Sequence, residues 1–129
     1  MKKGRHYSAL KSFLMLALLI PLSQAEEPLK YRSMAAHITS PDQYQKLFEN
    51  DQVIVLRMAL MPGESDNIHV HRDETVYFEK GGVLQIKSEG KVIEADIPDG
   101  HVMWHSSWEH QVRNIGTTTV VAVIVESKN

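Results

Sequence analysis

The sequence contains no cysteine, and this absence limits both how the protein is stabilised and which metals it binds. A domain without disulfides has to be held together by its hydrophobic core. A metal site without thiolates uses only nitrogen and oxygen ligands, which excludes structural zinc sites of the cysteine type and disfavours Cu(I). Divalent Mn, Fe, Co, Ni, Cu and Zn remain compatible with such ligands.

Several motifs of common enzyme classes are also missing from the sequence. It has no Gly-rich phosphate-binding loop, no Ser-His-Asp nucleophile elbow and no Cys-x-x-Cys pair. It also shows no internal repeat, no low-complexity segment and no second domain. Chemistry on a nucleophilic serine or a thiol is therefore not indicated, and any reaction is expected to depend on a metal.

The first 25 residues have the pattern of a secretion signal that is cleaved. Four basic residues precede an apolar core at residues 13–22, which is too short to span a membrane. Ser23 and Ala25 then occupy the small-residue positions of a signal-peptidase site. The pattern predicts export to the periplasm or secretion, with no membrane span left after cleavage.

Removal of the signal leaves 104 residues with an acidic balance, enough for one domain. Four of the 14 Lys and Arg, and none of the 16 Asp and Glu, lie in residues 1–25, so the rest carries a net charge of about −6. A nucleic-acid-binding protein needs a basic face, so this balance argues against nucleic acid as a partner. A small-molecule ligand is the expected partner.

The segment at residues 26–50 is predicted to form an N-terminal arm with a short helix. Its first half favours one edge strand near residues 31–37. Ser40 has the character of a helix N-cap and Pro41 that of the first helical position, so a helix is expected over residues 42–50.

Residues 51–129 are predicted to form a β-barrel. Residues 53–60 are rich in β-branched and long apolar side chains, and short strands separated by turn signals follow at regular intervals. Many short strands with little helix between them indicate an all-β sandwich or barrel. The later strands are expected at residues 67–71, 75–79, 83–88, 91–96, 102–105, 109–114 and 119–126.

The run at residues 120–125, VVAVIV, is apolar on both faces of the expected strand. A strand in a single small barrel normally has one face in water. The outer face is therefore covered by a homodimer partner or by the N-terminal arm, or the strand is buried within the monomer.

The chemistry of the chain is concentrated between residues 62 and 82. His69 and His71 are separated by one residue, so they point to the same side of an extended strand, and Glu74 follows closely. Two imidazoles with a nearby carboxylate make up most of a site for a divalent first-row metal.

The wider layout resembles the cupin superfamily. Gly63 stands six residues before His69 and Gly81 seven after Glu74, while Gly100 precedes His110 and Asn114 further along. Two departures are present: only two residues separate His71 from Glu74, and the Pro-x-Gly of the second motif is replaced by residues 106–109, SSWE. The resemblance covers residues 47–126 and is closest to small single-domain bacterial cupins. It implies a double-stranded β-helix of the jelly-roll type.

The same resemblance implies a site for one divalent transition metal (Fe, Mn, Ni, Zn, Co or Cu). Its expected ligands are His69, His71, Glu74 and His110, with His110 approaching from the opposite sheet. A three-histidine site, with Glu74 only hydrogen-bonded to a histidine or a water, is the alternative. Arg57, Trp104 and His105 are candidates for lining the ligand pocket, whereas His37 in the arm is expected at the surface or at an interface.

The expected function is that of an exported metal-binding mini-cupin acting on a small organic ligand. With a metal in place, dioxygenase or isomerase chemistry would be available. A non-catalytic protein that binds a small ligand or the metal itself, and a structural dimer stapled by its metal, are the alternatives. Because this fold supports many activities, the sequence does not decide whether the protein is an enzyme.

Overall fold

A computed structural model describes residues 28–129, and the predicted signal at residues 1–25 lies outside the described part of the chain. The described residues form two short helices followed by strands. In chain order the elements are α1 (Leu29–Met34), α2 (Ala36–Thr39), β1 (Tyr44–Glu49), β2 (Val53–Leu60), β3 (His69–His71), β4 (Glu74–Lys80), β5 (Gly82–Ser88), β6 (Lys91–Ile97), β7 (Val102–His105), β8 (Trp108–Asn114) and β9 (Val120–Ser127).

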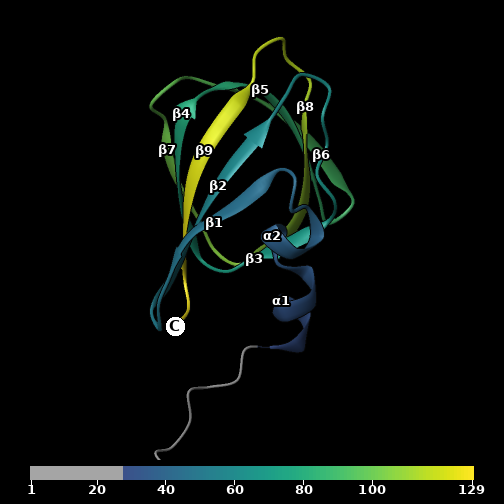
Figure 1. Cartoon of the computed structure of the whole chain (residues 1–129). Coiled ribbons are helices and arrows are strands. Elements are labelled where there is room, and N and C mark those ends of the chain that lie inside the picture. The colour runs from purple at the N-terminus through teal and green to yellow at the C-terminus, as the bar shows by residue number, and fades with distance from the viewer. Residues whose placement is uncertain (1–27) are drawn as a thin grey trace, which may run out of the picture.

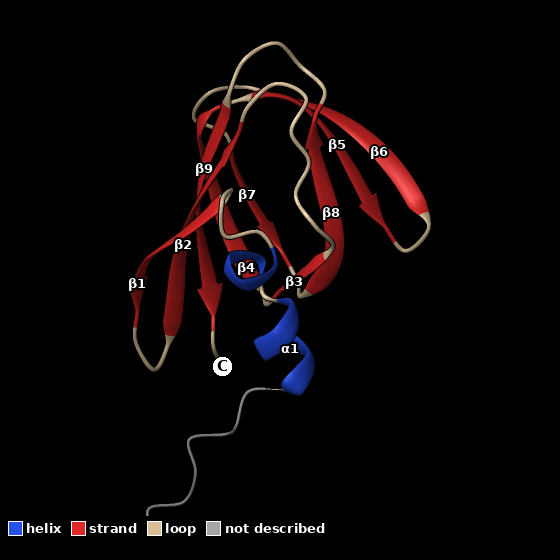
Figure 2. Ribbon diagram, turned by 45° about the vertical axis from the view of Figure 1, so that its right-hand side comes forward, coloured by secondary structure: helices blue, strands red, loops and turns tan. Residues whose placement is uncertain are grey.

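The strands form two antiparallel sheets that face each other, as Figures 1 and 2 show. One sheet has the strand order β1-β2-β9-β4-β7 and the other β3-β8-β5-β6. β9, the last strand of the chain, lies between β2 and β4 in the five-stranded sheet. This arrangement confirms the predicted double-stranded jelly-roll architecture.

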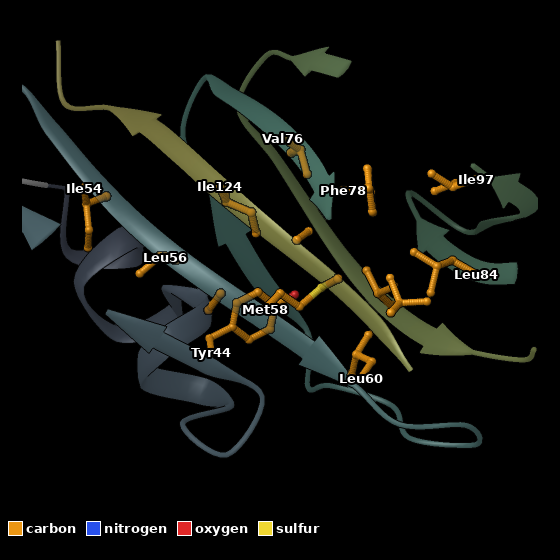
Figure 3. Close-up of a cluster of buried hydrophobic side chains, with 14 residues drawn as sticks. Tyr44, Ile54, Leu56, Met58, Leu60, Val76, Phe78, Leu84, Ile97 and Ile124 are labelled. Carbon is orange, nitrogen blue, oxygen red and sulfur yellow. The ribbon is translucent and has the colours of Figure 1, made fainter. Parts of the chain in front are cut away.

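The hydrophobic core lies between the two sheets (Figure 3). In β2 every second side chain is buried, from Ile54 to Leu60, as expected for a strand with one face toward the interior. Phe78 and Ile124 extend this layer from β4 and β9, and Leu84 faces it from the other sheet. The inward faces of both sheets are therefore fixed by the period of two in the sequence.

Two of the connections between strands require particular backbone conformations or a residue without a side chain. Glu89 and Gly90 both have positive φ, 50° and 72°, between β5 and β6, which suits a tight hairpin. Gly81 joins β4 to β5, and a Cβ there would lie 1.8 Å from the carbonyl oxygen of Ile97. Only glycine fits at position 81 without moving the backbone of β6.

The N-terminal segment differs from its predicted structure at two places. Residues 29–39 form helices α1 and α2 in place of the expected edge strand near residues 31–37. The helix expected over residues 42–50 is wrong: a turn at residues 41–43 leads into β1, which pairs with β2. Ser40 is therefore not a helix N-cap: it directly follows α2, and its hydroxyl accepts a hydrogen bond from the backbone N–H of Asn67.

The outer face of β9 is only partly covered in the monomer. Val121 is 8% exposed among its neighbours in the sheet, but Val125 is 38% exposed. Helices α1 and α2 pack against β3 and β1 at the end of the barrel. In the described part of the chain, no helix has the length and apolarity needed to cross a membrane.

Candidate metal centre

Two neighbouring strands place three histidines on the inner face of the four-stranded sheet. His69 and His71 alternate with Val70 in β3, and β8 pairs with β3 so that His110 lies directly opposite His69. Residues directly opposite in an antiparallel pair share a face. The expectation that His110 approaches from the opposite sheet is therefore wrong, because β3 and β8 are adjacent strands of one sheet.

The three imidazoles converge in the interior. One nitrogen from each of them lies within 4.8 Å of the other two. His69, His71 and His110 are 0%, 1% and 5% exposed. The structure thus brings together three of the four residues that the sequence marks as metal ligands.

Hydrogen bonds made by the Nδ1 atoms of His69 and His71 determine that the Nε2 atoms point toward the histidine cluster. Nδ1 of His69 lies 2.7 Å from the carbonyl oxygen of Asn67, which can only accept, so this nitrogen carries the proton and donates. Nδ1 of His71 lies 2.5 Å from Oε1 of Glu126 and donates to that carboxylate. Metal-binding histidines in proteins have the same arrangement: one nitrogen donates to a carbonyl or carboxylate and the other is left for the metal.

The remaining nitrogens of these two rings face each other. Nε2 of His69 and Nε2 of His71 are 2.9 Å apart. In the neutral imidazoles both atoms carry lone pairs, and two lone pairs at this distance repel unless a cation lies between them. Nδ1 of His110 is buried and has no hydrogen-bond partner among the described residues. These residues fit a divalent transition metal.

Glu74 lies beside this cluster and outside it. Its Oε1 accepts a hydrogen bond from Nε1 of Trp108 at 2.7 Å. Its Oε2 is 3.4 Å from Nδ1 of His71, the nitrogen that is turned away from His69, and has no hydrogen-bond partner among the described residues. Glu74 is 2% exposed, so this oxygen is a buried acceptor without a donor.

The opposite sheet and the loop before β3 supply three further polar residues that the sequence analysis did not select. Glu126 of β9 accepts from His71 through one oxygen and from the hydroxyl of Tyr31 through the other, at 2.6 Å. The hydroxyl of Tyr44 in β1 donates to Asp66 at 2.8 Å and lies 3.5 Å from Nε2 of His69. The sequence does contain a signal for Glu126. It follows Val120, Ala122 and Ile124 at a spacing of two residues, so its side chain is on the buried face of β9.

Burial and neighbouring charges change the acidity of these groups. Burial lowers the pKa of His69 to about 4, and it also lowers the pKa of His110. Burial alone would lower the pKa of His71 too, but the hydrogen bond that His71 donates to Glu126 and the charges of Glu74 and Glu126 outweigh it and raise this pKa. His71 therefore holds the proton in the cluster when no ion competes for it.

Burial has the opposite effect on the carboxyl groups. It raises the pKa of Asp66 to about 6 and also raises the pKa of Glu74. For Glu126, burial opposes ionisation, but the hydrogen bond from His71 outweighs it and lowers the pKa. The carboxyl group that touches His71 is thus the one held in its charged form.

A small cavity of about 50 Å³ adjoins the histidines. The polar residues in its lining are His71, His110, Tyr44, Glu74 and Trp108. The rest of the wall is apolar, from Met58, Val76, Phe78, Leu84, Ile86, Ile97, Met103, Val112 and Ile124. The volume is enough for a few atoms next to the histidine cluster.

Two of the residues predicted to line the pocket lie elsewhere. Arg57 alternates with the buried Leu56 and Met58 of β2 and therefore points to the outer face of the sheet. Trp104 is 64% exposed on β7. His105 is half-buried and stacks on Trp108 with 3.8 Å between ring centroids, so it supports the wall without lining the cavity.

His37 lies in α2, outside the histidine cluster. This placement agrees with its expected position away from the metal site. Asn114, the last residue of the second motif, is 0% exposed and donates to the carbonyl oxygens of Leu60 and Thr118. It holds the loops at the far end of the barrel.

Comparison with solved structures identifies the architecture. A cupin domain from Bordetella pertussis superposes with a TM-score of 0.63 at 24% sequence identity, covering 67% of this chain and 92% of that one. The barrel has the cupin fold. An RmlC-like cupin family protein with a double-stranded β-helix fold, from Methanocaldococcus jannaschii, gives a TM-score of 0.55 at 16% identity over 65% of this chain and 77% of its own.

The cupin fold is also seen in a more distant structure. A cupin domain from Schizosaccharomyces pombe matches with a TM-score of 0.50 at 11% identity, over 65% of this chain and 63% of that one. No family model and no curated protein matches the sequence. At these identities the similarity establishes the cupin fold alone, and the function has to be argued from the site.

Proposed function

We propose that this cupin is an exported protein that binds one divalent transition metal through His69, His71 and His110 and acts with it on a small organic ligand. The single observation that carries the proposal is the approach of two buried Nε2 atoms to 2.9 Å, with both Nδ1 atoms committed to acceptors. Only a proton or a metal ion satisfies that geometry.

The donor set favours a transition metal. Imidazole nitrogen suits Fe, Mn, Co, Ni, Cu and Zn, whereas Ca²⁺ and Mg²⁺ prefer oxygen ligands. Three protein ligands leave coordination positions open, which is typical of catalytic sites, while structural sites are closed by four. When bound, such an ion would supply Lewis-acid chemistry or, as iron, chemistry with dioxygen.

The chain's own residues define what a ligand has to be. The cavity wall is apolar except at the side of the histidines, and about 50 Å³ admits only a small molecule or one end of a larger one. Glu74 borders this cavity beside His71 and His110, and its Oε2 accepts no hydrogen bond from the described residues. Glu74 is therefore assigned as the group that accepts a proton from the ligand or donates a hydrogen bond to it, while Trp108 fixes its other oxygen.

A non-catalytic role is the second candidate, and the depth of the site favours it. All three histidines are at least 95% buried, so a bound ion is shielded from water. A protein that stores or carries a metal, or binds a small ligand without turning it over, would use the same residues. A turnover assay separates this role from the enzymatic one.

The first experiment measures the metal. Protein isolated from its native compartment is analysed for metal content, and we expect about one transition-metal ion per chain. The double variant His69→Gln/His110→Gln should contain none. His101→Gln, which changes an exposed histidine outside the cluster, is the matched control and should keep the full content. Full metal content in the double variant would contradict the ligand assignment.

The second experiment asks whether the loaded protein is an enzyme. Oxygen consumption and product formation are followed with a panel of small organic acids, hydroxy acids and carbonyl compounds. Turnover by the wild type that is lost in Glu74→Gln, with metal content unchanged, would support the enzymatic role. Tight binding of a panel member without turnover would support the non-catalytic role.

Export is a separate part of the proposal. Its support is the basic, apolar and small-residue pattern of residues 1–25. Cell fractionation with N-terminal sequencing tests it: the mature chain should begin at Glu26 and appear outside the cytoplasm. An intact N-terminus in the cytoplasm would contradict this part and leave the metal site unaffected.

A further inference from the structure

The described part of the N-terminal arm, residues 28–40, lies at the end of the barrel beside β3, as Figures 1 and 2 show, and β3 carries His69 and His71. It contains α1 and α2. Ala35 forms a parallel bridge with Val70, which lies between His69 and His71 in β3. Ser40 accepts a hydrogen bond from the backbone of Asn67, whose carbonyl oxygen in turn holds His69. The arm is thus packed directly on the strand that carries two of the three histidines.

One buried carboxylate connects this arm to the cluster. Glu126 is 0% exposed, and its two oxygens have different partners. Oε1 accepts the Nδ1 proton of His71 at 2.5 Å, and Oε2 accepts the hydroxyl proton of Tyr31, in α1, at 2.6 Å. The backbone N–H of Arg72 also approaches Oε2, at 3.4 Å. The orientation of the carboxylate toward His71 therefore depends on a residue of the arm.

Tyr31 is itself held in place. It is 6% exposed, and the guanidinium of Arg72 lies 4.0 Å above the centre of its ring. Arg72 directly follows His71 in the chain, so both the carboxylate and the cation that hold Tyr31 are connected to the same histidine. Tyr31 is therefore held by a hydrogen bond to Glu126 and by a cation–π contact with Arg72, in addition to its packing in the arm.

We propose that Tyr31 is a positioning residue for the metal site: through Glu126 it holds His71 in the orientation that binds the metal, and metal binding in turn holds the arm on the barrel. The inference rests on the proposed metal-binding function. Its physical basis is reciprocity: if docking of the arm strengthens metal binding by some factor, metal binding strengthens docking of the arm by the same factor.

The first test uses conservative variants and two metals. Tyr31→Phe removes one hydroxyl and keeps the ring under Arg72, while Glu126→Gln keeps the shape and removes the charge. We expect Zn²⁺ affinity, measured by competition with a chromogenic chelator, to fall by about tenfold in the first and by up to about 100-fold in the second, the range typical of residues that orient metal ligands. The visible absorption spectrum of the Co²⁺ form should change in both.

Lys30→Ala is the matched control. Lys30 also belongs to α1 and forms an exposed ion pair with Glu109 at 2.8 Å, which does not involve Glu126. Exposed ion pairs contribute little to stability, so Zn²⁺ affinity and the Co²⁺ spectrum should stay as in the wild type. An equal loss of affinity in Lys30→Ala and Tyr31→Phe would mean that the arm acts only as a general cover, and would overturn the specific role of Tyr31.

The second test measures the reverse direction. Hydrogen exchange is followed at the arm amides that are bonded within α1 and α2, those of Ala35, Ile38, Thr39 and Ser40. Saturating Zn²⁺ should slow their exchange in the wild type, and it should slow it by a smaller factor in Tyr31→Phe. Equal protection by Zn²⁺ in both proteins would overturn the link.

The outcomes separate this inference from the proposed function. A wild-type protein that binds neither Zn²⁺ nor Co²⁺ overturns the proposed function itself. A wild type that binds both, together with a Tyr31→Phe variant of unchanged affinity and unchanged Co²⁺ spectrum, overturns the role of Tyr31 alone. Because Tyr31→Phe removes only one hydroxyl, its folded state can be verified by its unfolding transition before the comparison is made.

Discussion

The hydroxyl of Tyr44 donates to Asp66 over 2.8 Å while lying 3.5 Å from Nε2 of His69. Tyr44 belongs to β1, an edge strand of the five-stranded sheet, and Asp66 precedes β3. The other oxygen of Asp66 accepts the backbone N–H of Val112 in β8, at 2.7 Å. One carboxylate therefore joins the edge of one sheet to the strands that carry the histidines.

Removing this hydroxyl should lower the stability of the protein. Tyr44→Phe leaves one oxygen of a buried carboxylate without its donor, which costs about 1–3 kcal/mol in the free energy of unfolding. Urea unfolding of the metal-free protein measures it. Tyr77→Phe, which alters a 46% exposed tyrosine of β4, is the control and should unfold as the wild type does.

Metal removal should destabilise the domain. An ion that binds only the folded state adds about 2.7 kcal/mol to the free energy of unfolding at a free concentration of 100 times the dissociation constant. Chelation should therefore lower the thermal midpoint of the wild type, and added Zn²⁺ should restore it. The double variant His69→Gln/His110→Gln should respond to neither; a matching response would mean that the ion binds elsewhere.

Metal affinity should depend on pH in two steps. The raised pKa of His71 means that this group keeps its proton up to a higher pH than a free histidine, and below that pKa the metal has to displace the proton. Affinity should thus fall about tenfold per pH unit as the pH drops below that raised pKa. It should fall more steeply near pH 4, where His69 also takes up a proton.

Calorimetry in buffers of different ionisation enthalpy gives the number of protons released on metal binding. We expect about one at pH values below the raised pKa of His71, the proton of that residue. An affinity for Zn²⁺ that stays constant between pH 7 and pH 4 would exclude a site made of histidines.

Gly81 should tolerate no side chain. Its Cβ would meet the backbone oxygen of Ile97 at 1.8 Å, so Gly81→Ala should destabilise the protein by about 3 kcal/mol or more, since the backbone has to move. Gly100→Ala is the control: the added Cβ meets open space, and only the positive φ of 79° is unfavourable. Its cost should be about 1–2 kcal/mol. Chemical denaturation of both variants gives the comparison.

The predicted homodimer also has a testable surface. On the outer face of the five-stranded sheet, Thr75 of β4 lies between Trp104 of β7 and Val125 of β9 in one row, and Val102 lies opposite Tyr77 in the next. Trp104 and Val102 are 64% and 58% exposed. We expect sedimentation to show a dimer that Trp104→Ser weakens, whereas a wild type that sediments as a monomer would contradict the prediction.

The sequence predicted strands such as β2, β4 and β8 well because each of these three buries one face at a period of two. It did not predict β1 over residues 44–49, where only Tyr44 is buried and the backbone hydrogen bonds come from pairing with β2. Local signals at Ser40 and Pro41 favoured a helix, and a distant strand overruled them. Edge strands of this kind depend on a partner that a local pattern cannot reveal.

For the site, spacing identified the three histidines, but contacts between distant strands had to come from the structure. Glu126, which orients His71, lies 55 residues from it. Arg57 was placed at the pocket on its charge alone, although its position between Leu56 and Met58 already puts it on the other face of β2. The strand period is thus a better guide to a pocket wall than residue polarity.

The hydrogen bond between Tyr31 and Glu126 spans 95 positions of the chain. Glu126 lies in β9, which is synthesised after the strands that carry the histidines and inserts between β2 and β4, which precede it in the chain. A partly synthesised chain therefore holds its three histidines without the carboxylate that orients one of them. If the polypeptide crosses a membrane unfolded, the environment in which folding ends, and not the one in which translation occurs, determines which ion is captured.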